Sequence, residues 1–177
     1  MDQYTNEELL SQLRAGDRKA FLYLYEAYKY GLYQYCLRLL RDGSLAEDAV
    51  QQTFEKVFSK CSTVANPSLL RSWIYTIARN ESFGIMREKS PEVSIEEDCM
   101  STEPSALESI EDEEAADGVR RAIGMLSPAY QEVIVLREYE GASYDEIARI
   151  TNSTVSSVKS KLFKARCVLM ERIKSTV

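Results

Sequence analysis

Residues 142–165 read ASYDEIARITNSTVSSVKSKLFKA, and this stretch decides the fold of the C-terminal part of the chain. It opens with Ser143-Tyr-Asp-Glu146, a capping box that predicts the start of a short helix. The next residues, Thr151-Asn-Ser153, predict a tight turn in which Asn152 takes the left-handed backbone conformation. A second helix is predicted to begin at about Thr154. Two helices joined by so short a turn have the spacing of a helix-turn-helix.

The two predicted helices divide into an apolar face and a polar face. Ile147 on the first helix is expected to pack against Val158 and Leu162 on the second, and the small Ala148 permits a close crossing. The outer face of the second helix combines small hydroxyl residues with lysines: Ser156, Ser157, Lys159, Ser160, Lys161 and Lys164. Such a face suits insertion into the major groove with neutralisation of phosphates. An ordinary solvated amphipathic helix is the alternative interpretation.

The charge of the chain is unevenly distributed. The 177 residues carry a net charge of −6, which taken alone argues against nucleic-acid binding. Residues 90–119, however, hold eleven acidic side chains and no lysine or arginine, whereas residues 120–177 hold ten basic and six acidic ones. The net charge of the part with the predicted helix-turn-helix is therefore positive, and nucleic acid returns as a candidate partner.

Helical signals also run through the N-terminal half. Thr5-Asn-Glu-Glu8 is a capping box, and Asp17 is placed to cap a long helix that ends near Arg41. Ser44-Leu-Ala-Glu47 predicts another capped start, and Asn66-Pro67 a third. No strand pattern competes with these helices. The sequence therefore predicts an all-α protein with a first domain over 1–89, an acidic flexible linker over 90–116 and a second domain over 117–177.

Several classes of function are excluded by composition. The chain has no histidine, and its four cysteines lie far apart, so neither a zinc site nor a disulfide framework is expected. Glu47 and Asp48 are neighbours on a helix and point about 100° apart, which makes them a poor catalytic pair. We expect no enzyme activity, no metal and no cofactor. The polar N-terminus and the lack of a long apolar run predict a cytoplasmic protein without membrane insertion.

Three further motifs resemble conserved segments of bacterial sigma factors. Leu126-Ser-Pro-Ala-Tyr-Gln-Glu-Val-Ile-Val-Leu-Arg-Glu138 with the helix-turn-helix resembles their C-terminal promoter-reading domain. Ala46-Glu-Asp-Ala-Val-Gln51 and Leu70-Arg-Ser-Trp-Ile-Tyr-Thr-Ile-Ala-Arg-Asn80 resemble the first conserved domain of the extracytoplasmic-function (ECF) group. The resemblance implies two helical domains and a role in transcription initiation, commonly in a stress response.

The resemblance also implies site residues and partners. The first domain would bind the β′ coiled coil of core RNA polymerase through Glu47, Asp48, Gln51 and Phe54. It would engage the −10 promoter element through the 62–67 loop and the following helix, where the candidates are Arg71, Arg79, Asn80, Arg87 and Lys89. Trp73 of that helix could stack on a base, although a core role is the favoured interpretation. The second domain would read the −35 element with the polar face described above and contact the β flap.

The chain departs from the family pattern at two places. Family members commonly carry acids where this chain has Leu45 and Gln52, and simple divergence is the plain explanation. The sharper hypothesis is that phosphorylation supplies the missing charge, at Thr63 in preference to Ser59. The second departure is Gly84-Ile-Met-Arg-Glu-Lys89, which replaces an arginine-rich run and puts the −10 preference in question.

Control of the protein and one rival function remain open at this point. Regulation by an anti-sigma factor or by a Ser/Thr kinase fits the sequence equally well. A helix-turn-helix regulator that acts without core polymerase is the alternative function, but it leaves the motif at 46–54 and the motif at 70–80 unexplained. Polymerase-dependent transcription would separate the two.

Overall fold

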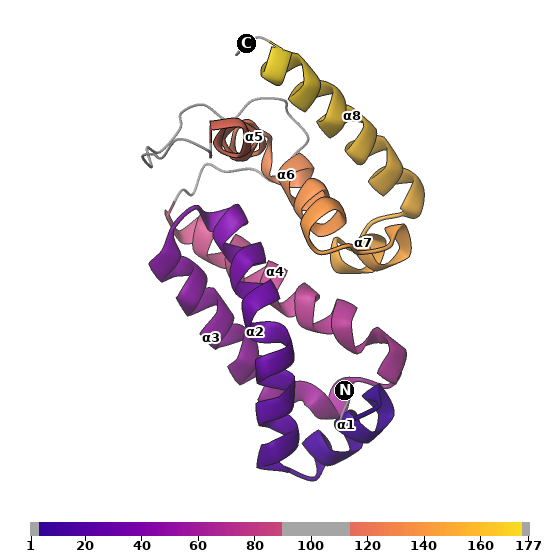
Figure 1. Ribbon diagram of the computed structural model, residues 1–177. Coiled ribbons are helices and arrows are strands. Elements are labelled where there is room, and N and C mark those ends of the chain that lie inside the picture. Colours follow the sequence, from indigo (N-terminus) through magenta and orange to yellow (C-terminus); the bar gives the residue numbers. More distant parts are fainter. Residues whose placement is uncertain (1–3, 90–113, 175–177) are drawn as a thin grey trace. The chain divides into compact units, whose positions relative to one another are not determined.

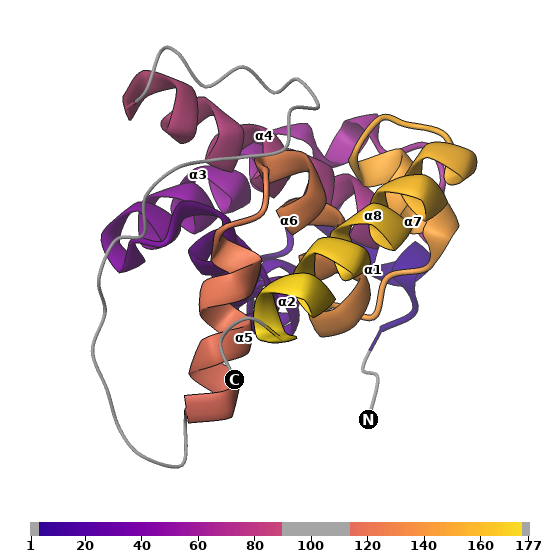
Figure 2. The ribbon, with the colours of Figure 1, turned by 90° about the horizontal axis from the view of Figure 1, so that it is seen from above.

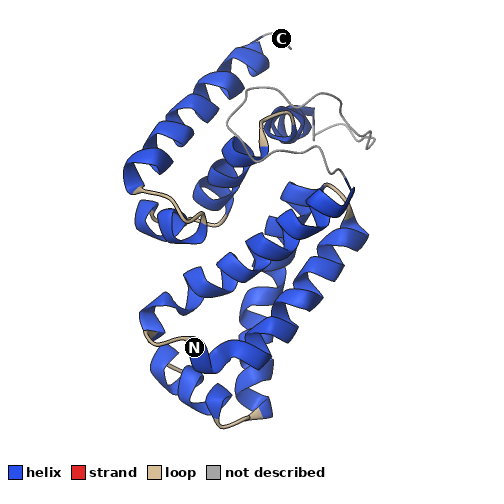
Figure 3. Cartoon of the chain, turned by 180° about the vertical axis from the view of Figure 1, so that it is seen from behind, coloured by secondary structure: helices blue, strands red, loops and turns tan. Residues whose placement is uncertain are grey.

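The structure is a computed structural model that describes residues 4–89 and 114–174. Every regular element in these two ranges is helical, as Figure 3 shows, so the predicted all-α class is confirmed. The chain divides near residue 91 into two compact units, and each is described separately below. The predicted linker lies outside the described residues as far as residue 113.

The first unit is built from helices α1 to α4 (Figure 1). In chain order its elements are α1 (Asn6–Arg14), α2 (Arg18–Leu40), α3 (Gly43–Lys60), the 3-10 turns η1 (Cys61–Thr63) and η2 (Pro67–Leu69), and α4 (Leu70–Lys89). Helices α2, α3 and α4 pack on one another, and α1 packs on α2, η1 and η2. The core between the long helices includes Leu24, Leu32, Val57 and Ile74, all fully buried.

The starts of these helices confirm most of the predicted caps. In α1, Glu8 N donates to Thr5 Oγ1 at 3.2 Å and Thr5 N donates to Glu8 Oε2 at 2.9 Å, which completes the capping box. Asp17 caps α2 by accepting from Lys19 N at 2.7 Å. The helix ends where Arg41 adopts a left-handed φ of 55°.

The predicted capping box at Ser44 is wrong. Helix α3 begins earlier, at Gly43, because the Asp42 carboxylate accepts from Leu45 N at 3.0 Å and takes the N-cap position. Ser44 is thereby placed inside the first turn, and Glu47 has no capping role. The Glu47 carboxylate is therefore available to a partner, on the exposed side of α3.

The second unit contains α5 (Glu114–Gly124), α6 (Pro128–Ile134), the π-helical turn η3 (Val135–Tyr139), α7 (Tyr144–Ile150) and α8 (Val155–Lys174). Helix α8 packs against α6 and α5, an arrangement seen from above in Figure 2. Buried apolar side chains on these elements, among them Ile123, Leu136, Ile147 and Leu162, form its core. Helix α5 begins before the Asp117 expected from the sequence.

Candidate functional site

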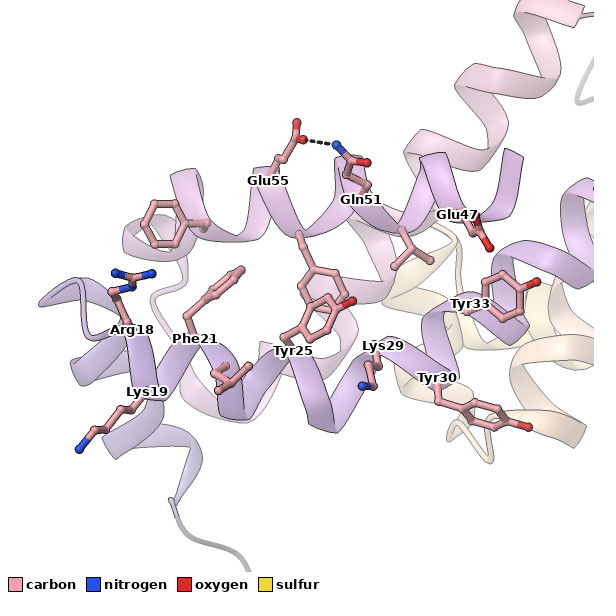
Figure 4. Close-up of a pocket in the computed structure, with 14 residues that line it drawn as sticks. Arg18, Lys19, Phe21, Tyr25, Lys29, Tyr30, Tyr33, Glu47, Gln51 and Glu55 are labelled. Atoms are coloured by element: carbon pink, nitrogen blue, oxygen red, sulfur yellow. Dashed lines mark hydrogen bonds between the residues drawn. The ribbon is translucent and has the colours of Figure 1, made fainter. Parts of the chain in front are cut away.

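Helix α3 exposes most of the residues that the sequence assigns to polymerase binding. Glu47, Asp48 and Gln51 are exposed, and Gln51 Nε2 donates to Glu55 Oε1 at 3.0 Å (Figure 4). Phe54 is only 5% exposed, because its ring packs on the ring of Tyr25 at a centroid distance of 4.7 Å. A partner can therefore reach three carboxylates and one amide on this face, those of Glu47, Asp48, Glu55 and Gln51. The Phe54 ring lies beneath them.

Beside this face, α2 and α3 enclose an apolar groove of about 1210 Å³ (Figure 4). Glu47, Gln51 and Phe54 line it from α3. Leu22 on α2 and Phe58 on α3 also line it, and they are 59% and 56% exposed. Large apolar side chains left open to water in a continuous groove indicate a protein-binding surface.

The α2 side of the groove was not among the predicted site residues. Sequence periodicity assigns the apolar side chains of α2 to the core, and Leu24 and Leu32 do lie there. The sequence does hold one sign of this second face: Leu22 and Tyr30 are large hydrophobic residues that fall outside the periodicity of the core positions. A helix that is apolar on more than one face has more than one packing partner.

Helix α4 carries the predicted −10 residues, and two of its arginines lie over aromatic rings one turn further along. The Arg71 guanidinium carbon is 5.0 Å from the centroid of Tyr75, and that of Arg79 is 4.7 Å from the centroid of Phe83. Both rings are buried. Packing of this kind holds the guanidinium planes at the helix surface.

The other predicted α4 residues lie further out. Asn80, Arg87 and Lys89 are exposed, and Lys89 Nζ is 3.8 Å from Asp42 Oδ2 at the start of α3. Trp73, for which the sequence favoured a core role, is intermediate between buried and exposed. The exposed surface of α4 is thus cationic, and Trp73 adds a partly exposed aromatic side chain to that helix.

The 62–67 loop precedes α4 and is fixed on both flanks. Thr63 Oγ1 donates to Lys60 O at 2.7 Å, and Ser68 N donates to Asn66 Oδ1 at 2.9 Å. The guanidinium of Arg14, from α1, donates to Val64 O. Between these anchors Ala65 and Asn66 are exposed.

Of the two hypothetical phosphorylation sites, Ser59 lies before this loop and Thr63 lies at its start. Ser59 is in the last turn of α3, and its Oγ donates to Lys56 O at 3.3 Å. Helix α3 ends at Lys60, so Thr63 does not continue the face of α3 that carries Ser59. Thr63 is instead exposed on the 3-10 turn η1.

In the second unit the local structure of the helix-turn-helix follows the sequence closely. Asn152 has the predicted positive φ, 50°. The capping box at α7 is complete, with Ser143 N donating to Glu146 Oε2 at 2.9 Å and Glu146 N to Ser143 Oγ at 3.2 Å. Thr154 Oγ1 caps α8 by accepting from Ser157 N at 3.1 Å.

The outer face of α8 offers most of the predicted −35 residues to solvent. Ser156, Lys159, Ser160 and Lys164 are exposed, whereas Ser157 and Lys161 are half-buried. Lys159 Nζ lies 5.7 Å from the centroid of Tyr144, the first residue of α7. The sequence missed Phe163, which is 70% exposed and lies outside the buried period of Val158, Leu162 and Ala165.

Two arginines connect the elements around this helix. Arg137 of η3 donates to Ala142 O at 2.8 Å and lies over the ring of Tyr144, 4.8 Å from its centroid. Arg166 of α8 donates to Glu138 Oε1 at 2.6 Å, and this hydrogen bond raises the pKa of the guanidinium above its ordinary value. The exposed Arg166–Glu138 pair contributes little to stability, but it connects α8 to η3.

Two other features bear on function. In the described ranges, no three cysteine or acidic side chains come together in a group that could hold a metal ion. None of the helices described combines the length and the apolar character that a membrane crossing requires.

Comparison with known proteins gives matches in both units. The sigma-70 region 2 model matches residues 24–90, and the sigma-70 region 4 model matches residues 116–166. The RNA polymerase sigma-H factor of Pseudomonas aeruginosa is 28% identical, over 94% of this chain and 92% of that protein. The ECF RNA polymerase sigma factor SigW of Bacillus subtilis is 25% identical, over 93% of this chain and 95% of that protein.

A solved structure is similar as well. It is the sigma factor RpoE in complex with the anti-sigma factor NepR from Bartonella quintana. The two chains are 29% identical with a TM-score of 0.69, and the match covers 88% of this chain and 98% of that one.

Proposed function

Because the chain belongs to the ECF sigma factors, which direct RNA polymerase to promoters, we propose that its two units divide this work between them. The first unit binds core polymerase through α3 and engages the −10 element through the 62–67 loop and α4. The second unit reads the −35 element with α8 and contacts the β flap. The proposal is carried by one observation: regions 2 and 4 of sigma-70 match this chain in that order, each on a helical unit.

Polymerase docking in this chain combines charge with apolar contact. Glu47 and Asp48 supply negative charge for the β′ coiled coil, but Leu45 and Gln52 stand where relatives commonly have acids. Fewer carboxylates weaken electrostatic steering. The groove between α2 and α3 adjoins Glu47 and Gln51 and exposes Leu22 and Phe58, so it adds apolar area to the same surface.

The −10 and −35 surfaces differ in the DNA that they suit. Arg71 and Arg79 pack over buried rings on α4, which holds their planar guanidinium groups where unpaired bases captured from the −10 element would stack on them. Asn80, Arg87 and Lys89 extend that surface. On α8, exposed hydroxyls and lysines near the helix start suit base edges and phosphates of an intact major groove.

Control by a second protein is the finer part of the proposal. The similar Bartonella sigma factor is held in a complex with an anti-sigma factor, and an inhibitor of that kind is one candidate here. A Ser/Thr kinase is the other, acting on Thr63 in preference to Ser59. The hydroxyl of Thr63 is exposed on a short 3-10 turn. A phosphate there would add about −2 charge to a helix end that lacks acids.

The phosphorylation hypothesis has a direct test. Wild type, Thr63→Ala and Thr63→Glu proteins would be compared in a pull-down of core polymerase from stressed and unstressed cells. We expect Thr63→Glu to bind more polymerase than Thr63→Ala, with wild type moving between them according to its phosphorylation. Equal binding by all three would remove the hypothesis and leave the rest of the proposed function intact.

The main proposal is tested by transcription in vitro. Purified chain and core polymerase would be incubated with a promoter library randomised in the −10 and −35 regions, and the transcripts sequenced. We expect transcripts that need both proteins and that share two sequence elements. Specific binding to duplex DNA without any polymerase-dependent transcription would favour the rival helix-turn-helix regulator.

A further inference from the structure

Helix α1 lies outside residues 24–90, the segment that the region 2 model matches, and the proposed function gives it no role. Its nine residues form a helix too short to be stable by itself. Leu9, Leu10 and Leu13 are buried, so packing against the rest of the unit holds it in place. The partners are informative: besides α2, α1 packs on η1 and η2, the two turns that flank the 62–67 loop.

Arg14 is the last residue of α1 and contacts the loop itself. Its guanidinium donates to the carbonyl of Val64, a residue fifty positions along the chain. Val64 is buried and its N–H donates to Cys61 O at 3.3 Å, so both its backbone groups are engaged. A hydrogen bond from a charged donor is stronger than one between neutral groups. Arg14 itself is exposed, and its charge is not trapped inside the fold.

We infer that α1 is a brace for the 62–67 loop and that Arg14 is a positioning residue for reading the −10 element. The inference rests on the proposed −10 role of this loop. With Val64 held by Arg14 and Asn66 held by its cap to Ser68, the exposed Ala65 and Asn66 are presented on a backbone fixed at both sides. A site that discriminates between bases needs such pre-organisation, since a loop that must first be ordered loses affinity for every base.

A purely structural role for Arg14 makes a different prediction. A residue that only stabilises the unit would, when changed, lower activity on all promoters by the same factor. A positioning residue changes the preference among −10 sequences while leaving −35 binding and polymerase binding in place. Base selectivity therefore separates the two roles, whereas total activity does not.

The experiment compares full-length wild type, Arg14→Ala and Arg14→Lys with core polymerase on the randomised −10 library. Selectivity is the ratio of transcripts from the preferred base to those from the other bases at each position. We expect Arg14→Ala to lower this ratio by about tenfold at one or two positions, as the loss of one charged hydrogen bond allows. Arg14→Lys keeps the charge without the planar fork and should lie between Arg14→Ala and wild type.

Two control variants accompany these proteins. Gln12→Ala changes an exposed residue of the same helix, and Arg121→Ala removes an exposed charge from α5. Both should retain wild-type selectivity. Hydrogen exchange in the free protein adds a readout that needs no promoter. The amides of residues 63–66 should exchange faster in Arg14→Ala than in Gln12→Ala, while α3 amides exchange equally in both.

The outcomes separate the inference from the proposed function. Full retention of −10 selectivity by Arg14→Ala, or a uniform fall on all −10 sequences, would overturn the brace and leave the sigma-factor proposal standing. A wild-type protein that gives no polymerase-dependent transcription would overturn both. An Arg14→Ala protein that fails to fold leaves Arg14→Lys as the deciding variant, with the same intermediate selectivity expected.

Discussion

Helices α4 and α8, the two proposed to contact DNA, hold their cations in different ways. On α4, Arg71 and Arg79 lie against buried rings of their own helix, at 5.0 and 4.7 Å from the ring centroids. On α8, Lys164 is exposed among small hydroxyl residues such as Ser160. Planar guanidinium groups over rings suit stacking with unpaired bases, whereas ammonium groups on flexible stems suit the phosphates of a duplex. Each helix therefore matches one state of promoter DNA.

The largest effect is expected on α8. Combined Lys159→Glu and Lys164→Glu changes should lower affinity for a duplex −35 element by about 100-fold at low salt, because each removes a phosphate contact and adds a repulsive charge. Fluorescence anisotropy with a labelled duplex over a salt series measures this, and the salt slope should fall as well. Polymerase binding should not change. The charge-matched control combines Arg120→Glu with Arg121→Glu, at two exposed positions of α5, and an equal loss with it would show a general charge effect instead of a helix-specific one.

A smaller effect is expected on α4, and it should appear in a different step. Arg79→Ala should slow promoter opening by about tenfold, because a planar cation on which an unpaired base can stack is lost. Binding to a duplex −35 element should be unchanged. Permanganate reactivity of thymines in the −10 region reports opening. Arg79→Lys keeps the charge without the planar guanidinium group, so its rate of promoter opening should lie between those of wild type and Arg79→Ala. A wild-type rate for Arg79→Lys would contradict the proposed difference between arginines on α4 and lysines on α8.

Two glycines, one in each unit, should have opposite effects on stability when they are changed to alanine. Gly84 lies within α4, and a methyl group added at its Cα would meet no neighbouring atom within 4 Å, so Gly84→Ala should stabilise the first unit by about 1 kcal/mol. Gly141, between η3 and α7, has a φ of +64°, and Gly141→Ala should destabilise the second unit by about 1–2 kcal/mol. Thermal unfolding of the two variants measures both changes. If both variants shifted the thermal midpoint in the same direction, the argument from the backbone conformation of the two glycines would be contradicted.

The smallest effect concerns the capping box of α1. Hydrogen bonds from the backbone and side chain of Thr5 lower the pKa of Glu8 below its ordinary value of 4.5. A lowered pKa means that the stabilisation is present above the ordinary value and is lost as the pH falls through the folded value. Glu8→Gln should therefore lower the thermal midpoint slightly at pH 7 and not at pH 2. A difference that persisted at pH 2 would assign the effect to something other than the carboxylate.

How far the sequence predicts each region depends on whether the signal is local. Asn152 in its left-handed turn and the box at Ser143 and Glu146 follow from a few adjacent residues, and both are confirmed. The predicted start of α3 was wrong because Asp42 and Ser44 compete for one cap, and a local pattern cannot weigh two candidates that differ in acceptor strength.

The parts of the candidate site that sequence reasoning missed depend on packing between distant segments. The groove exists because α2 and α3 bring Leu22 and Phe58 together, and no spacing within one helix reports that. The contact from Arg14 to Val64 joins residues fifty positions apart. Family resemblance supplied the proposed roles of exposed residues, but the region 2 match starts at residue 24 and therefore passes over α1.

The π-helical turn η3 has a consequence for how the second unit tolerates changes in length. A π-helical turn holds one residue more than the α-helical turn it replaces. Removal of a single residue from Val135–Tyr139 would therefore convert the turn to an ordinary α-helical one, while the residues on either side keep nearly the same faces. The same deletion inside α8, a regular α-helix, would turn every following residue by about 100°. A one-codon deletion should therefore be tolerated better in η3 than in α8.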